Sequence, residues 1–262
     1  MSQDEHRWHQ YSIGTGYIKK LSEFSGKKVV VFDAGPIISL TTSNLLSTLE
    51  RLKEKYAGSF IIPESVKYEL VDEPLQTKKF MFEALQVQRL ISIGVLDVIE
   101  DGDVKELTLE LLKIANHCFS AKGRAVQIVQ YGEMASIAAA KLLDAEALVL
   151  DERITRELVE HPKHLTDLMG RRLHMVMNEN EPSLKLLANY TWGLKILRSS
   201  ELMAVAYEAS LLGRYVANGE EAAIPNIMEK LLESVLWGLK LHGCAITVQD
   251  IATLTTSVQN GA

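Results

Sequence analysis

Two short, wholly apolar runs that each end at an aspartate constrain the fold of this chain more than any other feature. Val29–Phe32 (VVVF) is followed directly by Asp33, and Ala147–Leu150 (ALVL) is followed directly by Asp151. Short runs without alternating polar residues are typical of strands that are buried on both faces of a parallel sheet. Because ligands bind at the carboxyl edge of such sheets, we expect both aspartates to lie where a site can form.

Segments with helical character separate these runs. Phe60–Ile62 is a third apolar run, stopped by Pro63, and Gly193–Leu197 is a candidate for the last strand. Helical periodicity or composition follows the runs over residues 37–56, 64–71, 75–90, 103–118, 132–143, 155–160 and 226–243. The alternation of strand and helix predicts an α/β fold with a parallel sheet.

Composition excludes several classes of protein. The chain has 262 residues, 47% of them hydrophobic, which suits one or two domains with a sizeable core. Cys118 and Cys244 lack CxxC spacing, so a disulfide framework or a thiolate zinc site is not expected. No apolar stretch approaches the roughly 18 residues of a membrane span. The polar first residues do not form a secretory signal, and we expect a cytoplasmic protein without membrane contact.

Two further acids accompany the strand-end aspartates. Glu69 lies on the expected helix after the second apolar run, and Glu133 opens an Ala-rich helix. Carboxylates brought together repel one another and stay ionised only when a cation joins them. Oxygen ligands of this kind favour Mg²⁺, Mn²⁺ or Ca²⁺, and such ions can hold a phosphate and activate water. The sequence therefore suggests a metal site made by Asp33, Glu69, Glu133 and Asp151.

Each acid also has an ordinary structural interpretation. Asp33 or Asp151 alone can be a helix cap, Glu133 can favour its helix dipole, and Glu69 can be a solvated surface residue. The common pattern of all four favours the metal site. The formal net charge of −6 argues against nucleic-acid binding, although cations bound at an acidic site would offset part of it.

Three segments of the chain resemble the PIN domain family. VVVFDAGPIISL resembles the opening of PIN domains, where an Asp follows the first strand. IIPESVKYEL resembles their second segment, and YGEMASIAAAKLLDAEALVLDERITREL resembles the third and fourth together. The resemblance covers roughly residues 28–215 and is closest to the archaeal and bacterial branch related to toxin ribonucleases.

The resemblance implies a fold, an activity and partners. The fold would be a three-layer α/β/α sandwich with a central parallel sheet. The activity would be Mg²⁺- or Mn²⁺-dependent hydrolysis of RNA, with Asp33, Glu69, Glu133 and Asp151 as catalytic, metal-holding residues. The family also implies frequent homodimers, and its toxin branch an antitoxin-like partner. The chain departs from the family at Ala34, where Ser or Thr is common. Ser39 can supply a hydroxyl instead, although a place at the helix N-terminus is the stronger expectation.

The expected organisation has three parts. Residues 1–27 form an N-terminal extension, residues 28–215 the PIN-like domain, and residues 216–262 a C-terminal helical region. The PIN-like domain would carry a helical insertion at about residues 72–130.

Four basic residues are weaker candidates for contacts with RNA phosphates. Arg153 and Arg156 follow Asp151, and Lys122 and Arg124 lie in an expected loop before Glu133. Ordinary surface pairing with neighbouring acids is the alternative for the two arginines. The rival function is a catalytically inactive PIN-like scaffold that binds RNA or protein. A phosphatase or nucleotide-binding domain is disfavoured, because no GxxxxGK[ST] loop or GxGxxG turn follows a strand.

Overall fold

The computed structural model describes residues 18–217, 220 and 223–261. Residues 1–17 of the expected N-terminal extension lie outside this part, and residues 18–27 contain β1 (Ile18–Lys19) and the short 3-10 helix η2 (Leu21–Phe24). Among the described residues, no helix has the length and apolar character that crossing a membrane requires.

A parallel sheet forms the centre of the molecule. Within the described residues it has six strands, in the spatial order β1, β4, β3, β2, β7, β9. The remaining five are β2 (Val29–Phe32), β3 (Ser59–Pro63), β4 (Asp97–Ile99), β7 (Ala147–Val149) and β9 (Ile196–Leu197). Every pairing in this sheet is parallel. Strand β2 lies between β3 and β7, so the residue that follows it stands in the middle of the carboxyl edge.

Side chains of β2 alternate between two separate cores, which explains why the strand is wholly apolar. Val30 and Phe32 pack into one core, while Val29 and Val31 pack into the other. Because both faces of the sheet are covered by helices, no position of the strand faces water.

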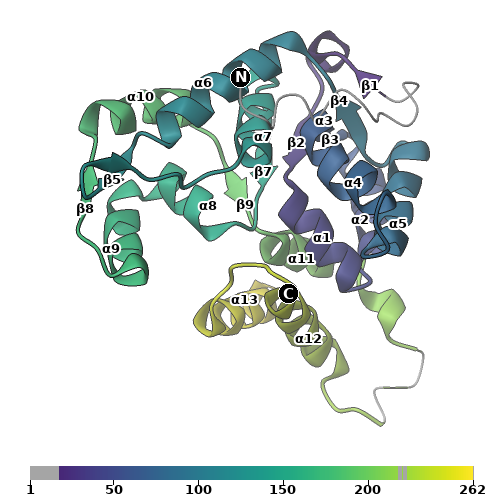
Figure 1. Cartoon of the computed structure of the whole chain (residues 1–262). Coiled ribbons are helices and arrows are strands. Elements are labelled where there is room, and N and C mark those ends of the chain that lie inside the picture. Colours follow the sequence, from purple (N-terminus) through teal and green to yellow (C-terminus); the bar gives the residue numbers. More distant parts are fainter. Residues whose placement is uncertain (1–17, 218–219, 221–222, 262) are drawn as a thin grey trace.

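Helices cover the two faces and complete three layers (Figure 1). On the first face lie α1 (Ala34–Thr42), α2 (Leu46–Tyr56), α3 (Glu64–Lys67), the π-helical turn η3 (Tyr68–Asp72), α4 (Glu73–Leu75), α5 (Met81–Ser92), α11 (Ser199–Glu208) and α12 (Ile227–Leu241). On the second face lie α6 (Gly102–Ala115), α7 (Tyr131–Leu142), α8 (Arg153–Glu160), α9 (Pro162–Leu173) and α10 (Glu181–Thr191). The predicted three-layer α/β/α sandwich with a central parallel sheet is therefore confirmed.

The segment at about residues 72–130 contributes to the sheet as well as to the helical layers. It contains α5 and α6, and between them it supplies β4, which pairs with β1 and β3. Its last part forms β5 (Phe119–Ala121) and β6 (Arg124–Ala125), which join β8 (Met177–Glu179) in a small antiparallel sheet. The segment expected as a helical insertion is thus partly a component of the central sheet.

Some elements differ from the sequence expectation. The helix expected over residues 37–56 is broken into α1 and α2, with Asn44 in the left-handed region at a φ of 59°. Residues 161–190, which have no clear pattern, form α9, β8 and α10. A further helix, α13 (Val248–Gly261), occupies the expected tail. The short 3-10 helix η4 (Gly213–Tyr215) follows α11.

The C-terminal helices pack on the sandwich. Leu232, Leu236 and Leu239 of α12 are buried in the core of the first face. Arg198, at the start of α11, donates to Asp250 of α13 at 2.8 Å. The C-terminal helical region therefore shares a core with the PIN-like part of the chain.

Two leucines of α12 test this shared core. Leu239 is fully buried, whereas Leu241 on the same helix is 77% exposed. Leu239→Ala should lower the free energy of unfolding by about 2–5 kcal/mol, because it leaves a cavity in the core. Leu241→Ala is the matched control and should change it by less than about 0.5 kcal/mol. Urea denaturation measures both free energies of unfolding. If Leu239→Ala changes this free energy as little as Leu241→Ala does, α12 does not belong to the core.

Candidate metal centre

Asp33 stands at the centre of the site. It directly follows β2, is 6% exposed, and is the N-cap of α1, where its Oδ2 accepts the Gly35 N–H at 3.4 Å. Ser136 of α7 donates to its Oδ1 at 3.2 Å. Burial raises the pKa of Asp33 from its ordinary 3.8 to about 6, and the nearby charge of Asp151 adds to this rise. The helix-cap interpretation is therefore confirmed for Asp33, and it is compatible with a place in the candidate site.

Glu69 approaches from the first helical layer. It lies on η3, and its side chain is accessible to solvent at the rim of the site. The protein around its carboxylate still removes part of its hydration, and this effect raises the pKa of Glu69 to about 7. The charges of Asp33 and Glu73 raise it further.

A buried ion pair spans the π-helical turn that carries Glu69. Lys67 donates to both carboxylate oxygens of Asp72 at 2.9 Å, and both side chains are about 5% exposed or less. The two residues are five apart in the chain, which matches the hydrogen-bond spacing of a π-helix. Single π-turns inside helices are frequent at functional sites, and this one directs Glu69 towards the sheet edge.

Glu133 comes from the second helical layer. It is the third residue of α7, and its Oε2 accepts the Gln130 N–H at 3.1 Å in a capping box. Thr155 of α8 donates to the same oxygen at 2.6 Å. Burial raises the pKa of Glu133 to about 7, and the charges of Asp33 and Glu152 contribute in the same direction.

Asp151 is the most enclosed of the four acids, at 2% exposure. Its Oδ1 accepts the backbone N–H of Ser199 at 2.7 Å. Its Oδ2 accepts the hydroxyls of Ser199 at 2.7 Å and Ser39 at 3.1 Å. Neighbouring Glu152 is exposed and caps α8 instead.

Asp33 is the acid that lies near each of the other three, Glu69, Glu133 and Asp151. Asp33 interacts electrostatically with each of the other three. Two glycines show how near the elements lie: a Cβ on Gly35 would be in ordinary contact with the Cβ of Asp151 at 3.5 Å, and one on Gly132 with Oε2 of Glu69 at 3.4 Å. Among the residues that the structure describes, no three His, Cys, Asp or Glu side chains come together closely enough to form a complete metal-binding group.

The chemistry of these donors fits a hard divalent cation. Within the described part of the chain, no Lys or Arg forms an ion pair with any of the four acids. Asp33, Glu133 and Asp151 interact instead with hydroxyls and backbone N–H groups. Some acids elsewhere do have a basic partner, as Asp72 has Lys67 and Asp250 has Arg198. The uncompensated negative charge is what Mg²⁺ or Mn²⁺ would offset.

Three hydroxyl residues of the site were not predicted from the sequence. Ser136 lies three positions after Glu133 on the same helix, and Ser199 follows the last strand of the sheet, so spacing and strand-end position could have found both. Thr155 had no comparable signal. Ser39 does not lie at the helix N-terminus but within α1, where its hydroxyl donates to Asp151.

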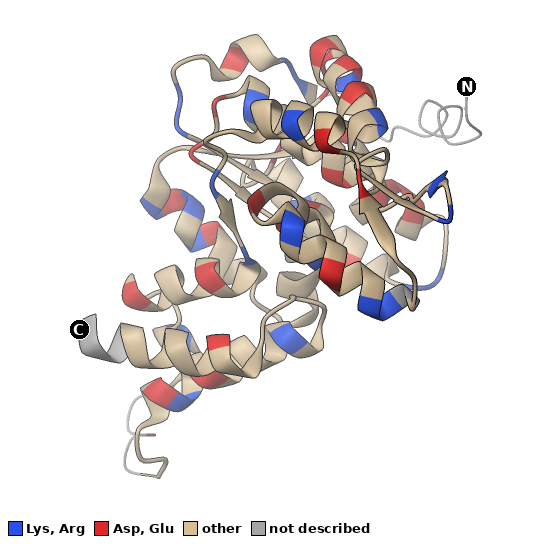
Figure 2. Cartoon of the chain, turned by 90° about the vertical axis from the view of Figure 1, so that its left-hand side faces the viewer, with Lys and Arg blue, Asp and Glu red and all other residues tan. Residues whose placement is uncertain are grey.

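The basic candidates lie outside this cluster. Arg153 and Arg156 form pairs with Glu157 and Glu160 on α8, each at 3.8 Å, as the alternative interpretation proposed. Lys122 and Arg124 are exposed on the β5–β6 hairpin. Figure 2 shows Lys and Arg interspersed with Asp and Glu along the helices that face the viewer.

Comparison with known proteins identifies the class that this fold and site define. A family model described as a PIN domain matches residues 29–163, a range that contains all four acids. The chain therefore belongs to the PIN domain family, whose members are generally nucleases that use divalent metal ions. No curated protein and no solved structure matches the chain.

Substitution of Asp33 tests the electrostatic cost of the site. The pKa of Asp33 in the folded protein is about 6, above its ordinary 3.8, so folding favours the protonated form. The metal-free protein should lose stability as the pH rises from about 4 to about 7, the window set by the raised pKa values of Asp33, Glu69 and Glu133.

Asp33→Asn should raise the free energy of unfolding at pH 8 by about 1–3 kcal/mol in EDTA, measured by urea denaturation. A loss of stability would contradict this account.

The buried pair beneath Glu69 is tested separately. Lys67→Met should destabilise the protein by about 3–5 kcal/mol, because it leaves Asp72 charged and buried without a partner. Lys67→Met combined with Asp72→Leu should recover most of that loss, since neither charge remains. Denaturation is measured for Lys67→Met, for Asp72→Leu and for the double variant. If the two residues were independent, the losses of the single variants would add in the double variant.

Proposed function

We propose that this protein is a Mg²⁺- or Mn²⁺-dependent ribonuclease that hydrolyses phosphodiester bonds. The observation that carries the proposal is the buried Asp33 carboxylate at the middle of the sheet edge, with Glu69, Glu133 and Asp151 around it and no basic partner among the described residues. The intact set of acids favours catalysis over the rival function, an inactive scaffold that binds RNA or protein.

The four acids have different roles in this proposal. Asp33, Glu69, Glu133 and Asp151 would hold the metal, and the raised pKa values of the first three reflect charge and desolvation that a cation relieves. Asp151 adds negative charge beside Asp33, while its three hydrogen bonds hold its carboxylate in place. A bound divalent ion would supply Lewis-acid activation of the phosphate and of the attacking water.

Hydroxyl groups keep the carboxylates in position. Ser136 fixes one oxygen of Asp33, and Thr155 fixes one oxygen of Glu133, which leaves the second oxygen of Glu133 free of that contact. Partners of this kind orient the ligands of a metal and are often needed for full activity. These two hydroxyls would keep the carboxylates of Asp33 and Glu133 oriented before substrate binds.

RNA as the substrate comes from the family resemblance. Arg153 is about half exposed and its pair with Glu157 is long, so it is the best placed of the four basic candidates to bind a phosphate. Arg156, Lys122 and Arg124 are the other candidates. Residues 28–215 as the catalytic unit, a cytoplasmic location, a homodimer and an antitoxin-like partner are further parts of the same proposal.

Cleavage of RNA by the purified protein tests the function. We expect cleavage in Mn²⁺ or Mg²⁺, none in EDTA, and a loss of at least about a hundredfold in Asp33→Asn, because electrostatic and metal contributions of this size are usual. Asp103→Asn, at an exposed acid on α6, is the matched control and should cleave normally. Cleavage that survives in Asp33→Asn would indicate a contaminant. No cleavage together with no Mn²⁺ binding by calorimetry would leave a binding scaffold.

A further inference from the structure

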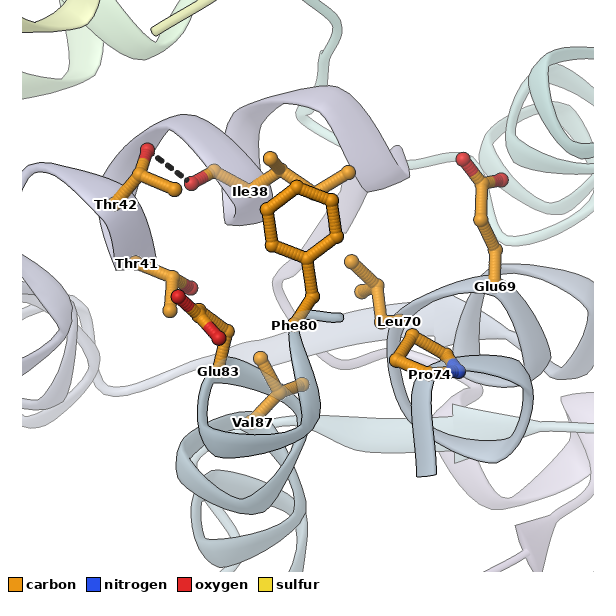
Figure 3. A pocket seen from close by; sticks show the side chains of 9 residues that line it. All are labelled: Ile38, Thr41, Thr42, Glu69, Leu70, Pro74, Phe80, Glu83 and Val87. Atoms are coloured by element: carbon orange, nitrogen blue, oxygen red, sulfur yellow. Dashed lines mark hydrogen bonds between the residues drawn. The ribbon is translucent and has the colours of Figure 1, made fainter. Parts of the chain in front are cut away.

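A cavity of about 90 Å³ adjoins the candidate metal centre. It lies between α1, the turn from η3 to α4, and the start of α5 (Figure 3). Most of its wall is apolar, formed by Ile38, Leu70, Pro74, Phe80 and Val87. Glu69 also lines it, so the cavity shares one residue with the candidate metal centre.

Phe80 has an unfavourable backbone conformation that places its ring at this cavity. Its φ is 61° and its ψ is 16°, in the left-handed region, directly before α5. This conformation is unfavourable for a bulky residue, because its Cβ lies too close to the neighbouring carbonyl oxygen. Its ring is 50% exposed and stands in front of the cavity (Figure 3), so burial in the core does not offset the cost. An unfavourable conformation retained at an exposed aromatic residue points to a binding role.

Charged groups around the cavity are arranged by sign. Lys78 and Lys79 directly precede Phe80 and are exposed, and the Nζ of Lys79 lies 4.7 Å from the centre of the Phe80 ring. A cation beside an exposed aromatic ring is the arrangement that binds the phosphates and stacked bases of single-stranded nucleic acids. The cavity wall itself carries Glu69 and Glu83, which would repel a phosphate.

The polar atoms of the wall are hydrogen-bond acceptors. Thr41 and Thr42 donate their hydroxyl protons to carbonyls of their own helix, at Ile37 and Ile38, so their oxygens have only lone pairs left to offer. Glu83 adds carboxylate oxygens. Acceptors in an apolar cavity suit the exocyclic amino group of a nucleobase.

We propose that this cavity binds one unpaired nucleobase of a single-stranded RNA, stacked on Phe80, while an adjacent phosphate lies at the carboxylate site. This inference rests on the proposed function, because Glu69 lines both the cavity and the candidate metal centre. Lys79 can bind a phosphate of the RNA backbone, and the acceptors of the cavity wall can bind the amino group of a base. These polar groups favour RNA over a second protein chain, for which an apolar surface would suffice.

Binding of a labelled single-stranded RNA of about ten nucleotides, followed by fluorescence anisotropy in Ca²⁺, tests the cavity. Phe80→Ala should weaken binding by about 5- to 150-fold, the loss expected for one stacked base, and Phe80→Trp should retain it. Phe82→Ala is the matched control. Phe82 lies two residues later in the first turn of α5, is 69% exposed, and does not line the cavity. It should bind within about twofold of wild type.

Abasic substitutions locate the stacked base. Each nucleotide of the RNA is replaced in turn by an abasic one. We expect one position at which the loss of the base weakens binding to the wild-type protein but not to Phe80→Ala, since that variant no longer has the ring. Losses spread evenly along the strand, or no binding of RNA by the wild-type protein, would overturn the proposal.

The remaining outcomes separate the cavity from the nuclease activity. Unchanged binding by Phe80→Ala, with cleavage that still depends on metal and Asp33, would overturn the cavity and leave the nuclease. Position-specific coupling without any metal-dependent cleavage would support the cavity and overturn the nuclease. A change of oligomeric state in Phe80→Ala by light scattering, with RNA binding unchanged, would make this surface an interface between copies of the chain and overturn the proposal.

Discussion

The burial of one carboxylate at the middle of a parallel sheet is the constraint on which the rest of this site depends. Asp33 stands there because β2 is flanked on both sides by other strands and is covered on both faces by helices. The same environment that excludes water disfavours its charge, and the neighbouring acids increase this cost. This cost is the reason why a divalent cation is part of the proposed function of the site.

The acids of the candidate site have different partners from the acids that form ion pairs elsewhere in the fold. Asp72 and Asp97 are neutralised by lysines and Asp250 by an arginine, and these pairs join neighbouring parts of the fold. The acids at the sheet edge are held by serine and threonine hydroxyls, which orient a carboxylate without cancelling its charge. This difference in partners separates the candidate site from the other buried acids of the chain.

The site draws on parts of the chain that lie beyond the family match at residues 29–163. Ser199, which holds Asp151, belongs to α11. Ser39, its other partner, also lies 3.4 Å from the carbonyl oxygen of His242, after α12. The helices at the bottom of Figure 1 therefore pack against the residues that support the site. Removal of this region would expose the α1 side of the core and disturb Asp151.

Much of the architecture was predictable because its signals are local. Apolar runs ending at Asp33 and Asp151 indicated two buried parallel strands, and three short segments indicated the PIN family, which the family match and the sheet confirm. The break between α1 and α2 at Asn44 was missed because helical periodicity continues across it. The apolar run at residues 95–99 indicated a candidate strand, but its place in the central sheet was missed, because pairing with β1 and β3 depends on tertiary contacts.

The sequence by itself determined which acids follow strands or open helices, because strand and helix ends are set by neighbouring residues. Only the tertiary structure decided how those acids meet. The order of strands placed Asp33 between the others, a π-helical turn presented Glu69, and hydroxyls from α1, α7, α8 and α11 held three of the carboxylates. It also placed Phe80 and Glu69 on the wall of one cavity, although their spacing in the chain contains no sign of this. Charge repulsion and burial act through space, so they depend on the packing of whole elements rather than on the order of residues.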